Sequence, residues 1–371
     1  MSILLSHTTA LEVLRRWELR GRLAKGERCA APPPAAPPTT EEMEELARRV
    51  PLVTACARPL EVLVSEGRPG VRGEVRANLQ RAPLPAGSAI EVAPGVACAS
   101  PEQLAVQMAP RLTDLELEVL LSELMGTYAI FPDGEEGMFR REEPLTTPER
   151  TRAHLARLGA RSGTARVRRA LEAACVRSAS PRETKLSLRL GLRPGRGGYH
   201  LNVLSMNEPL EVRRIHDRMR RGVRVPDILV SNPATGQVSA VEYHGRHHDG
   251  PLRAAQDAAR SNELKALSMS ESIVRREQYA DLAYLDGLVE TIRRELGLPR
   301  IGLGAAERAR RRELRQRLYE ELELIDGVSW QGLEREARRA VHAAAAEREG
   351  EELAAYESAR VDVPVEAYGL Q

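Results

Sequence analysis

Lysines, aromatic residues and paired cysteines are all scarce in this 371-residue chain. Only Lys25, Lys185 and Lys265 are lysines, so a catalytic lysine would have few candidates. The four cysteines include no Cys-x-x-Cys pair, which argues against a cysteine-based zinc site. No apolar run approaches the length of a membrane span, and the N-terminal residues carry charge too early for a secretion signal. We therefore expect a cytoplasmic protein without a membrane partner.

The length of the chain favours more than one domain, since a single core rarely organises so many residues. The proline-rich residues 30–40 cannot sustain a helix or a central strand and are typical of a linker or loop. We expect a mixed α/β domain over residues 1–140, a second α/β domain over residues 141–298, and a charged helical extension over residues 299–371. The net charge of +2 neither favours nor excludes a nucleic-acid partner.

Helix and strand signals alternate between residues 180 and 296. A serine and a proline begin a helix, and a turn sequence, Asn-Pro-Ala-Thr-Gly-Gln, separates two strand-like segments. The predicted elements are a helix from Ser180 to about Leu190, strands at Asp227–Val230 and Ser239–His244, a helix at Leu252–Leu267, a strand at Ser272–Arg275 and a helix at Leu282–Leu296. This order predicts a compact α/β domain, a mixed sheet flanked by helices.

Two acidic residues are spaced so that a hairpin would bring them together. The midpoint between Asp227 and Glu242 falls at Ala234 and Thr235, inside the predicted turn. Residues directly opposite on two antiparallel strands have Cβ atoms about 4.5–5.5 Å apart. Two carboxylates this close repel each other, and a divalent cation between them relieves the repulsion. By alternation His244 shares the face of Glu242, whereas Tyr243 points to the other face.

Structural roles for the acids also fit the sequence. Paired acids at strand ends are often solvated or neutralised by an arginine. Glu183 stands three residues after Ser180, as in a capping box, where its carboxylate would accept a hydrogen bond from a backbone amide. Capping does not prevent the first turn of a helix from directing the carboxylate into a site.

The segments SASPRETKLSLRLGL, VRVPDILV, AVEYHGRHHD and DAARSNELKAL follow one another in this order. Together they resemble the PD-(D/E)XK nuclease superfamily, and most closely its relatives of the very-short-patch-repair (Vsr-like) endonuclease, over about residues 178–295. The resemblance implies a restriction-endonuclease-like mixed sheet flanked by helices. It also implies that Glu183, Asp227 and Glu242 bind Mg²⁺ or Mn²⁺, and that the chain is a metal-dependent DNA endonuclease.

One position departs from the superfamily pattern. His244 stands where the superfamily lysine would orient the attacking water or stabilise developing charge. A histidine can perform either task, and His247 or His248 would lie near the same site. Lys185 and Lys265 are candidates for a displaced lysine, although exposed positions on helices suit both.

A cluster of basic residues precedes the first of these strands. Arg213, Arg214, Arg220 and Arg221 would lie close to the acids and could contact the DNA backbone. An ordinary solvated surface explains the cluster equally well.

The N-terminal half offers a weaker resemblance. Ser-His-Thr-Thr-Ala-Leu, the strand LEVLVS, the basic VRGEVRANLQRAPLP and GVACASPEQLAVQMA occur in the order seen in proteins similar to type IV abortive-infection antitoxins. This resemblance implies an alternative function, a regulatory protein that binds DNA or a toxin and whose nuclease-type domain is catalytically silent. A purely structural interaction module, with Glu183 only capping its helix, is the third interpretation. The sequence does not indicate the oligomeric state.

Overall fold

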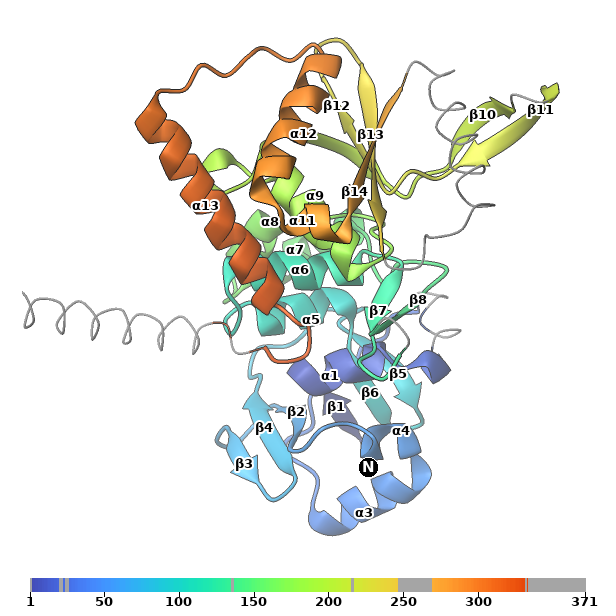
Figure 1. The fold of residues 1–371 in the computed structure, drawn as a ribbon. Helices are drawn as coiled ribbons and strands as arrows, with labels where there is room; N and C mark the ends of the chain where they lie inside the picture. Colours follow the sequence, from blue (N-terminus) through green and yellow to red (C-terminus); the bar gives the residue numbers. More distant parts are fainter. Residues whose placement is uncertain are drawn as a thin grey trace, which may run out of the picture.

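The computed structural model describes residues 2–19, 23, 27–134, 137–214, 217–245, 269–330 and 332. Over these residues the chain is a mixed α/β protein (Figure 1). Its buried side chains form two main hydrophobic cores. None of the described helices is long and apolar enough to cross a membrane. The four cysteines form no disulfide, and Cys56, Cys98 and Cys175 are buried.

The first half of the chain builds a six-stranded sheet with the spatial order β3–β4–β2–β1–β6–β5. Its strands are β1 (Ile3–Leu5), β2 (Leu60–Val64), β3 (Gly70–Arg72), β4 (Val75–Leu79), β5 (Ala89–Ala93) and β6 (Val96–Ala99). The sequence predicted only β2, because the other strands are short and weakly alternating. A small hairpin, β7 (Tyr128–Ile130) and β8 (Met138–Arg140), follows this sheet.

Helices that pack on this sheet or against one another supply the rest of the first core. They are α1 (His7–Leu14), α3 (Thr40–Arg49), α4 (Pro51–Thr54), α5 (Pro101–Met108), α6 (Asp114–Leu124), α7 (Pro148–Leu158) and α8 (Thr164–Ala170), with the 3₁₀ turn η1 (Trp17–Leu19). Each of α5, α6 and α7 begins at a serine or threonine whose side chain accepts a backbone N–H. The first core also includes buried residues between Leu145 and Leu171, beyond the domain boundary that we expected at residue 140. The position of the domain boundary stays a prediction.

The second core surrounds a four-stranded sheet with the order β14–β13–β12–β9. Its elements are α9 (Pro181–Gly191), the 3₁₀ turn η2 (Pro194–Arg196), β9 (Asn202–Met206), β12 (Ile228–Ser231), β13 (Val238–His244), β14 (Ser270–Arg275), α11 (Arg276–Ala280), α12 (Leu282–Glu295) and α13 (Ala305–Leu324). Strands β9, β12 and β13 are antiparallel neighbours, whereas β13 and β14 are parallel. The predicted helix, hairpin, strand and helix are confirmed at α9, β12–β13, β14 and α12; the predicted helix at 252–267 lies outside the described residues.

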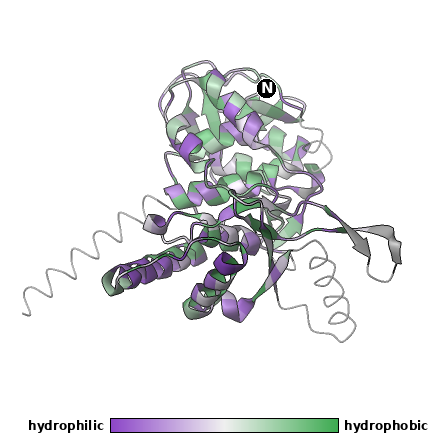
Figure 2. Ribbon diagram, turned by 90° about the horizontal axis from the view of Figure 1, so that it is seen from above, coloured by the Kyte–Doolittle hydropathy of each residue, from purple (hydrophilic) through white to green (hydrophobic). Residues whose placement is uncertain are grey.

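Two features of this half were absent from the prediction. Strand β9 forms the edge of the described sheet, and between β9 and β12 the chain adds a two-stranded ribbon, β10 (Leu210–Arg214) and β11 (Asp217–Arg224). Helix α13, which lies in the predicted charged extension, contributes Leu318, Leu322 and Ile325 to the second core. Figure 2 shows hydrophobic residues concentrated in the body of the protein and a largely hydrophilic α13.

Candidate functional site

The hairpin of β12 and β13 brings Asp227 and Glu242 together as predicted. Ile228 pairs with Val241, and this register continues through Ser231 and Val238, so the next residues outward, Asp227 and Glu242, face each other. The Tyr243 backbone N–H donates a hydrogen bond of 2.7 Å to Oδ2 of Asp227. The turn between the strands is closed by Asn232, whose backbone N–H donates to the Gln237 carbonyl at 2.9 Å.

The two acids lie on the face of the sheet opposite to the helices. Val230 and Val241 pack into the second core beneath α9 and α12, whereas Leu229 and Ala240 belong to a small apolar cluster on the other face. Alternation along each strand puts Asp227 with Leu229 and Glu242 with Ala240. His244 shares this face and is half-buried. Tyr243 packs into the second core against Tyr279, as the alternation predicted.

Burial and mutual repulsion change the acidity of the pair. Burial, followed by the negative charge of Glu183, raises the pKa of Asp227 from 3.8 to about 7. Burial, followed by the charges of Asp227 and Glu271, raises the pKa of Glu242 from 4.5 to about 8. The opposing effects on Asp227 come from the Tyr243 amide and from the charge of Arg140 on β8. Both carboxyls therefore hold their protons more tightly than free acids do, first because they are buried and then because negative charges lie nearby.

Glu183 reaches the same end of the sheet from the first turn of α9. Its carboxylate accepts hydrogen bonds from the Ala179 amide at 2.9 Å and the Ser180 hydroxyl at 3.0 Å. It therefore accepts a backbone amide as predicted, but from the residue before the N-cap and not from Ser180 itself, as a capping box would require. Its side chain is 6% exposed, and its charge contributes to the raised pKa values of both Asp227 and Glu242. Glu183 thus caps α9 and also contributes to the electrostatics of the pair.

Asn207 connects Glu183 to Asp227, a link that the sequence analysis missed. Its side-chain amide donates to Oε2 of Glu183 at 2.7 Å and to the Arg177 carbonyl at 3.0 Å. Its backbone N–H donates to the carbonyls of Pro226 and Asp227 at 3.0 and 3.2 Å. Asn207 has a positive φ of 49°, a conformation that asparagine adopts more readily than most residues. A polar residue directly after a strand was the only signal in the sequence.

Two charged residues also act on the pair without having been predicted. Glu271 of β14 pairs in register with Ala240, so by alternation it shares the face of Glu242. Arg140 comes from the β7–β8 hairpin of the first half of the chain. Both arrive through contacts between distant segments, which no local pattern could indicate.

The acid pair suits a hard divalent cation. A carboxylate has about four lone-pair positions. The Asp227 carboxylate accepts one described hydrogen bond, whereas that of Glu183 accepts three, including the one from Asn207. Over the described ranges, no group of three or more histidine, cysteine or acidic side chains is arranged to hold a metal ion. The structure therefore brings together a pair of acids, and Mg²⁺ binding by all three predicted acids stays a prediction.

The remaining predicted site residues divide into two groups. His248 lies outside the described residues, as do His247 and Lys265. Lys185 is buried at 8% exposure, with its Nζ 3.7 Å from a carboxylate oxygen of Glu323 on α13, and is therefore no surface residue. Of the predicted DNA-contacting arginines, Arg213 and Arg214 belong to β10, and Arg220 and Arg221 belong to β11.

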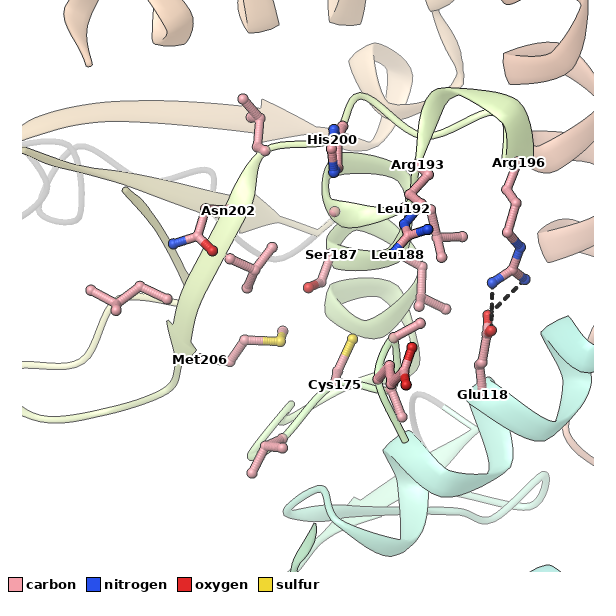
Figure 3. A pocket seen from close by; sticks show the side chains of 18 of the residues that line it. Glu118, Cys175, Ser187, Leu188, Leu192, Arg193, Arg196, His200, Asn202 and Met206 are labelled. Atoms are coloured by element: carbon pink, nitrogen blue, oxygen red, sulfur yellow. Dashed lines mark hydrogen bonds and ion pairs between the residues drawn. The ribbon is translucent and has the colours of Figure 1, made fainter. Parts of the chain in front are cut away.

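A groove of about 840 Å³ lies elsewhere, along the edge strand β9 and the C-terminal half of α9 (Figure 3). Arg196 crosses one side of it to bind Glu118 of α6, with hydrogen bonds of 2.5 and 3.0 Å. Asp227, Glu242 and Glu183 are not among its lining residues. The groove and the acid pair are thus separate features of the second half.

Comparison with protein-family models, with curated proteins and with solved structures found no match to this chain.

Proposed function

We propose that the second half of the chain is a metal-dependent DNA endonuclease of the PD-(D/E)XK, Vsr-like type, with Asp227 and Glu242 as its principal metal-binding acids. The observation that carries the proposal is the opposition of these two carboxylates at the end of an antiparallel hairpin. The order helix, three antiparallel strands and a fourth strand parallel to the third agrees with a restriction-endonuclease-like sheet. A divalent cation bound between the two buried carboxylates would offset the burial and the repulsion that raise both of their pKa values.

Mg²⁺ or Mn²⁺ bound there would polarise the phosphodiester and make hydroxide available near neutral pH. Asp227 and Glu242 would hold the ion, and the Tyr243 amide would fix the orientation of Asp227. Glu183 would add its charge from the first turn of α9, with Asn207 holding its carboxylate. Magnesium keeps several water ligands, so two direct carboxylates satisfy its preferences.

His244 is the side chain placed to handle the proton. It follows Glu242 by two residues on the same face of β13 and is half-buried. In the hydrolysis the oxygen of water attacks phosphorus, the bond from phosphorus to the leaving oxygen breaks, and that oxygen takes up a proton. The imidazole of His244 could orient the water or donate this proton.

The alternative proposal is a DNA-binding or antitoxin-like regulatory protein with a silent nuclease-type domain and a toxin or other protein as partner. Two observations favour it. No lysine belongs to the described part of the four-stranded sheet, and Lys185 is engaged with Glu323 instead. A domain of this kind would bind DNA without cutting it.

Cleavage of supercoiled plasmid separates the two proposals. We expect the native protein to nick plasmid with Mg²⁺ or Mn²⁺ and to lose this activity in EDTA. Asp227→Asn and Glu242→Gln should each reduce nicking at least about 100-fold, since each removes a charged metal ligand. His244→Ala should reduce it about 10- to 1000-fold.

Glu290→Gln is the matched control, because it makes the same chemical change at an exposed position on α12. This variant should cut like the native protein. If the native protein and its variants bind the plasmid but none of them nicks it with Mg²⁺ or Mn²⁺, the result favours the proposal of a regulatory protein. Nicking that survives in both Asp227→Asn and Glu242→Gln would refute the assignment of the acid pair.

A further inference from the structure

The ribbon of β10 and β11 projects from the second half of the molecule (Figure 1). Its strands pair in antiparallel register from Leu210 opposite Arg224 to Arg213 opposite Arg221. Within the described chain neither strand makes a substantial contact with another helix or strand. Only its root is anchored, where Leu210 packs against the apolar cluster of Leu229 and Ala240. Among the described residues, none from the ribbon belongs to either main hydrophobic core.

The composition of the ribbon is strongly basic. Residues 210–224 contain six arginines and two acids. The register puts Arg213 directly opposite Arg221, and alternation puts Arg218, Arg220 and Arg224 together on the other face. Like charges directly opposite on paired strands destabilise the pairing. The sequence of the ribbon is therefore suited to a polyanionic partner.

The root of the ribbon is tied to the acid pair. Val225 and Pro226 are the only residues between β11 and Asp227. At the other end of the insertion, Asn207 binds the carbonyls of Pro226 and Asp227 and the carboxylate of Glu183. A nucleic acid held along the ribbon would consequently pass close to Asp227.

We propose that the β10–β11 ribbon inserts into the major groove of duplex DNA and places the backbone at the acid pair. The inference rests on the proposed nuclease function for what happens to that DNA, and it identifies the substrate as B-form duplex. The major groove of B-DNA is about 12 Å wide and admits a two-stranded β-ribbon, whereas the deep, narrow major groove of A-form RNA does not. Arginines on both faces then reach the phosphates on both walls of the groove.

Binding is measured by fluorescence anisotropy with a DNA duplex of about 30 base pairs, the corresponding single strand and an RNA duplex. The duplex spans roughly three helical turns, so the ribbon can be accommodated away from the ends. All measurements use the full chain carrying Asp227→Asn, in EDTA, so that no cleavage interferes. We expect the DNA duplex to bind at least about 10-fold more tightly than the other two probes. Arg213→Glu/Arg221→Glu should weaken duplex binding at least about 30-fold and lower the slope of log K against log salt by about two.

The matched control is Arg300→Glu/Arg312→Glu, which makes the same change of charge at two exposed arginines outside the ribbon. It should change duplex binding less than about 3-fold. Arg213→Ala/Arg221→Ala removes the repulsion within the ribbon without adding acids, so it should leave thermal stability unchanged or higher while still weakening binding. Equal loss in the ribbon and control variants would overturn the inference, as would preferential binding of single strands or RNA.

The inference and the nuclease proposal can fail separately. Ribbon-dependent duplex binding together with an inert plasmid assay would leave the ribbon assignment standing and remove the nuclease. If Arg213→Glu/Arg221→Glu, with Asp227 and Glu242 intact, nicks plasmid as fast as the native protein does, the nuclease proposal is supported and the ribbon assignment is overturned.

Discussion

Ionisation of Asp227 and Glu242 lowers the free energy of unfolding of the protein. Both carboxyls hold protons more tightly in the folded chain, with pKa values of about 7 and about 8 against 3.8 and 4.5. The folded state therefore binds more protons than the unfolded state between about pH 4 and 8, and the free energy of unfolding falls as the pH rises through this range. Acids that destabilise the fold at neutral pH are typical of functional sites.

Asp227→Asn and Glu242→Gln should accordingly stabilise the fold, because each removes a charge and the asparagine introduced by the first keeps an acceptor for the Tyr243 amide. We expect a gain of about 1–3 kcal/mol at pH 8, from the cost of about 1.4 kcal/mol for each pKa unit. The gain should shrink steadily towards pH 4. Urea unfolding from pH 4 to pH 9 measures it, with Glu290→Gln as the control. A gain that does not depend on pH would contradict the electrostatic origin.

Helix-start and turn sequences explain how much of the site could be predicted. Ser180-Pro181 marks the start of α9, and the turn sequence marks the centre of the hairpin, so the register of Asp227 and Glu242 followed from counting. Glu271 could not be predicted, because its position depends on the pairing of β14 with β13. Arg140 could not be predicted, because it acts on Asp227 from the β7–β8 hairpin, which is distant in the sequence. The ribbon was missed because its many arginines conceal the alternation that usually indicates a strand.

At the scale of elements, α13 is attached to α9 by a mixed apolar and ionic contact. Arg182 donates to both carboxylate oxygens of Glu323 at 2.6 and 2.8 Å, and Lys185 lies 3.7 Å from the same carboxylate. Burial opposes ionisation of Glu323, but the hydrogen bond from Arg182 and the charge of Lys185 leave its pKa lowered. The contact therefore stabilises the fold above about pH 4.5, and the stabilisation is lost as the pH falls and Glu323 takes up a proton.

Glu323→Gln should reduce the free energy of unfolding by about 1–2 kcal/mol at pH 7, because it leaves the buried Lys185 without a carboxylate. The loss should shrink as the pH is lowered from 7 to about 3, because the native carboxyl takes up a proton as the pH falls. Glu320→Gln, on the exposed side of the same helix, is the control and should cost less than about 0.5 kcal/mol. Urea titrations at both pH values test this. Equal effects of the two substitutions would mean that α13 is held by its apolar residues alone.

At the scale of the whole molecule, α6 belongs to both hydrophobic cores. Leu117, Leu120 and Leu121 pack into the first core, whereas Leu115 and Val119 pack into the second. Glu118 on the same helix binds Arg196 of the second half, and Glu123 binds Arg15 of the first. A helix buried on all sides by two cores links their stabilities.

We therefore expect the intact protein to unfold in one cooperative transition. Calorimetry should give a single peak whose van't Hoff and calorimetric enthalpies agree. Leu120→Ala changes the first core and Leu188→Ala changes the second. Each should reduce the free energy of unfolding by about 2–5 kcal/mol and shift the single peak to a lower temperature. Two resolved peaks, with each substitution shifting a different one, would show that the cores unfold independently.

The register of β12 and β13 also limits which insertions and deletions the gene can accept. Extra residues within the turn after Asn232 only enlarge a loop, and the acids stay where they are. One extra residue between Ser239 and Glu242 would turn the glutamate towards Val230 and the helices, because each step along a strand changes its face. Length variation among descendants of this chain should therefore collect in the turn and spare the strand residues that precede the acid.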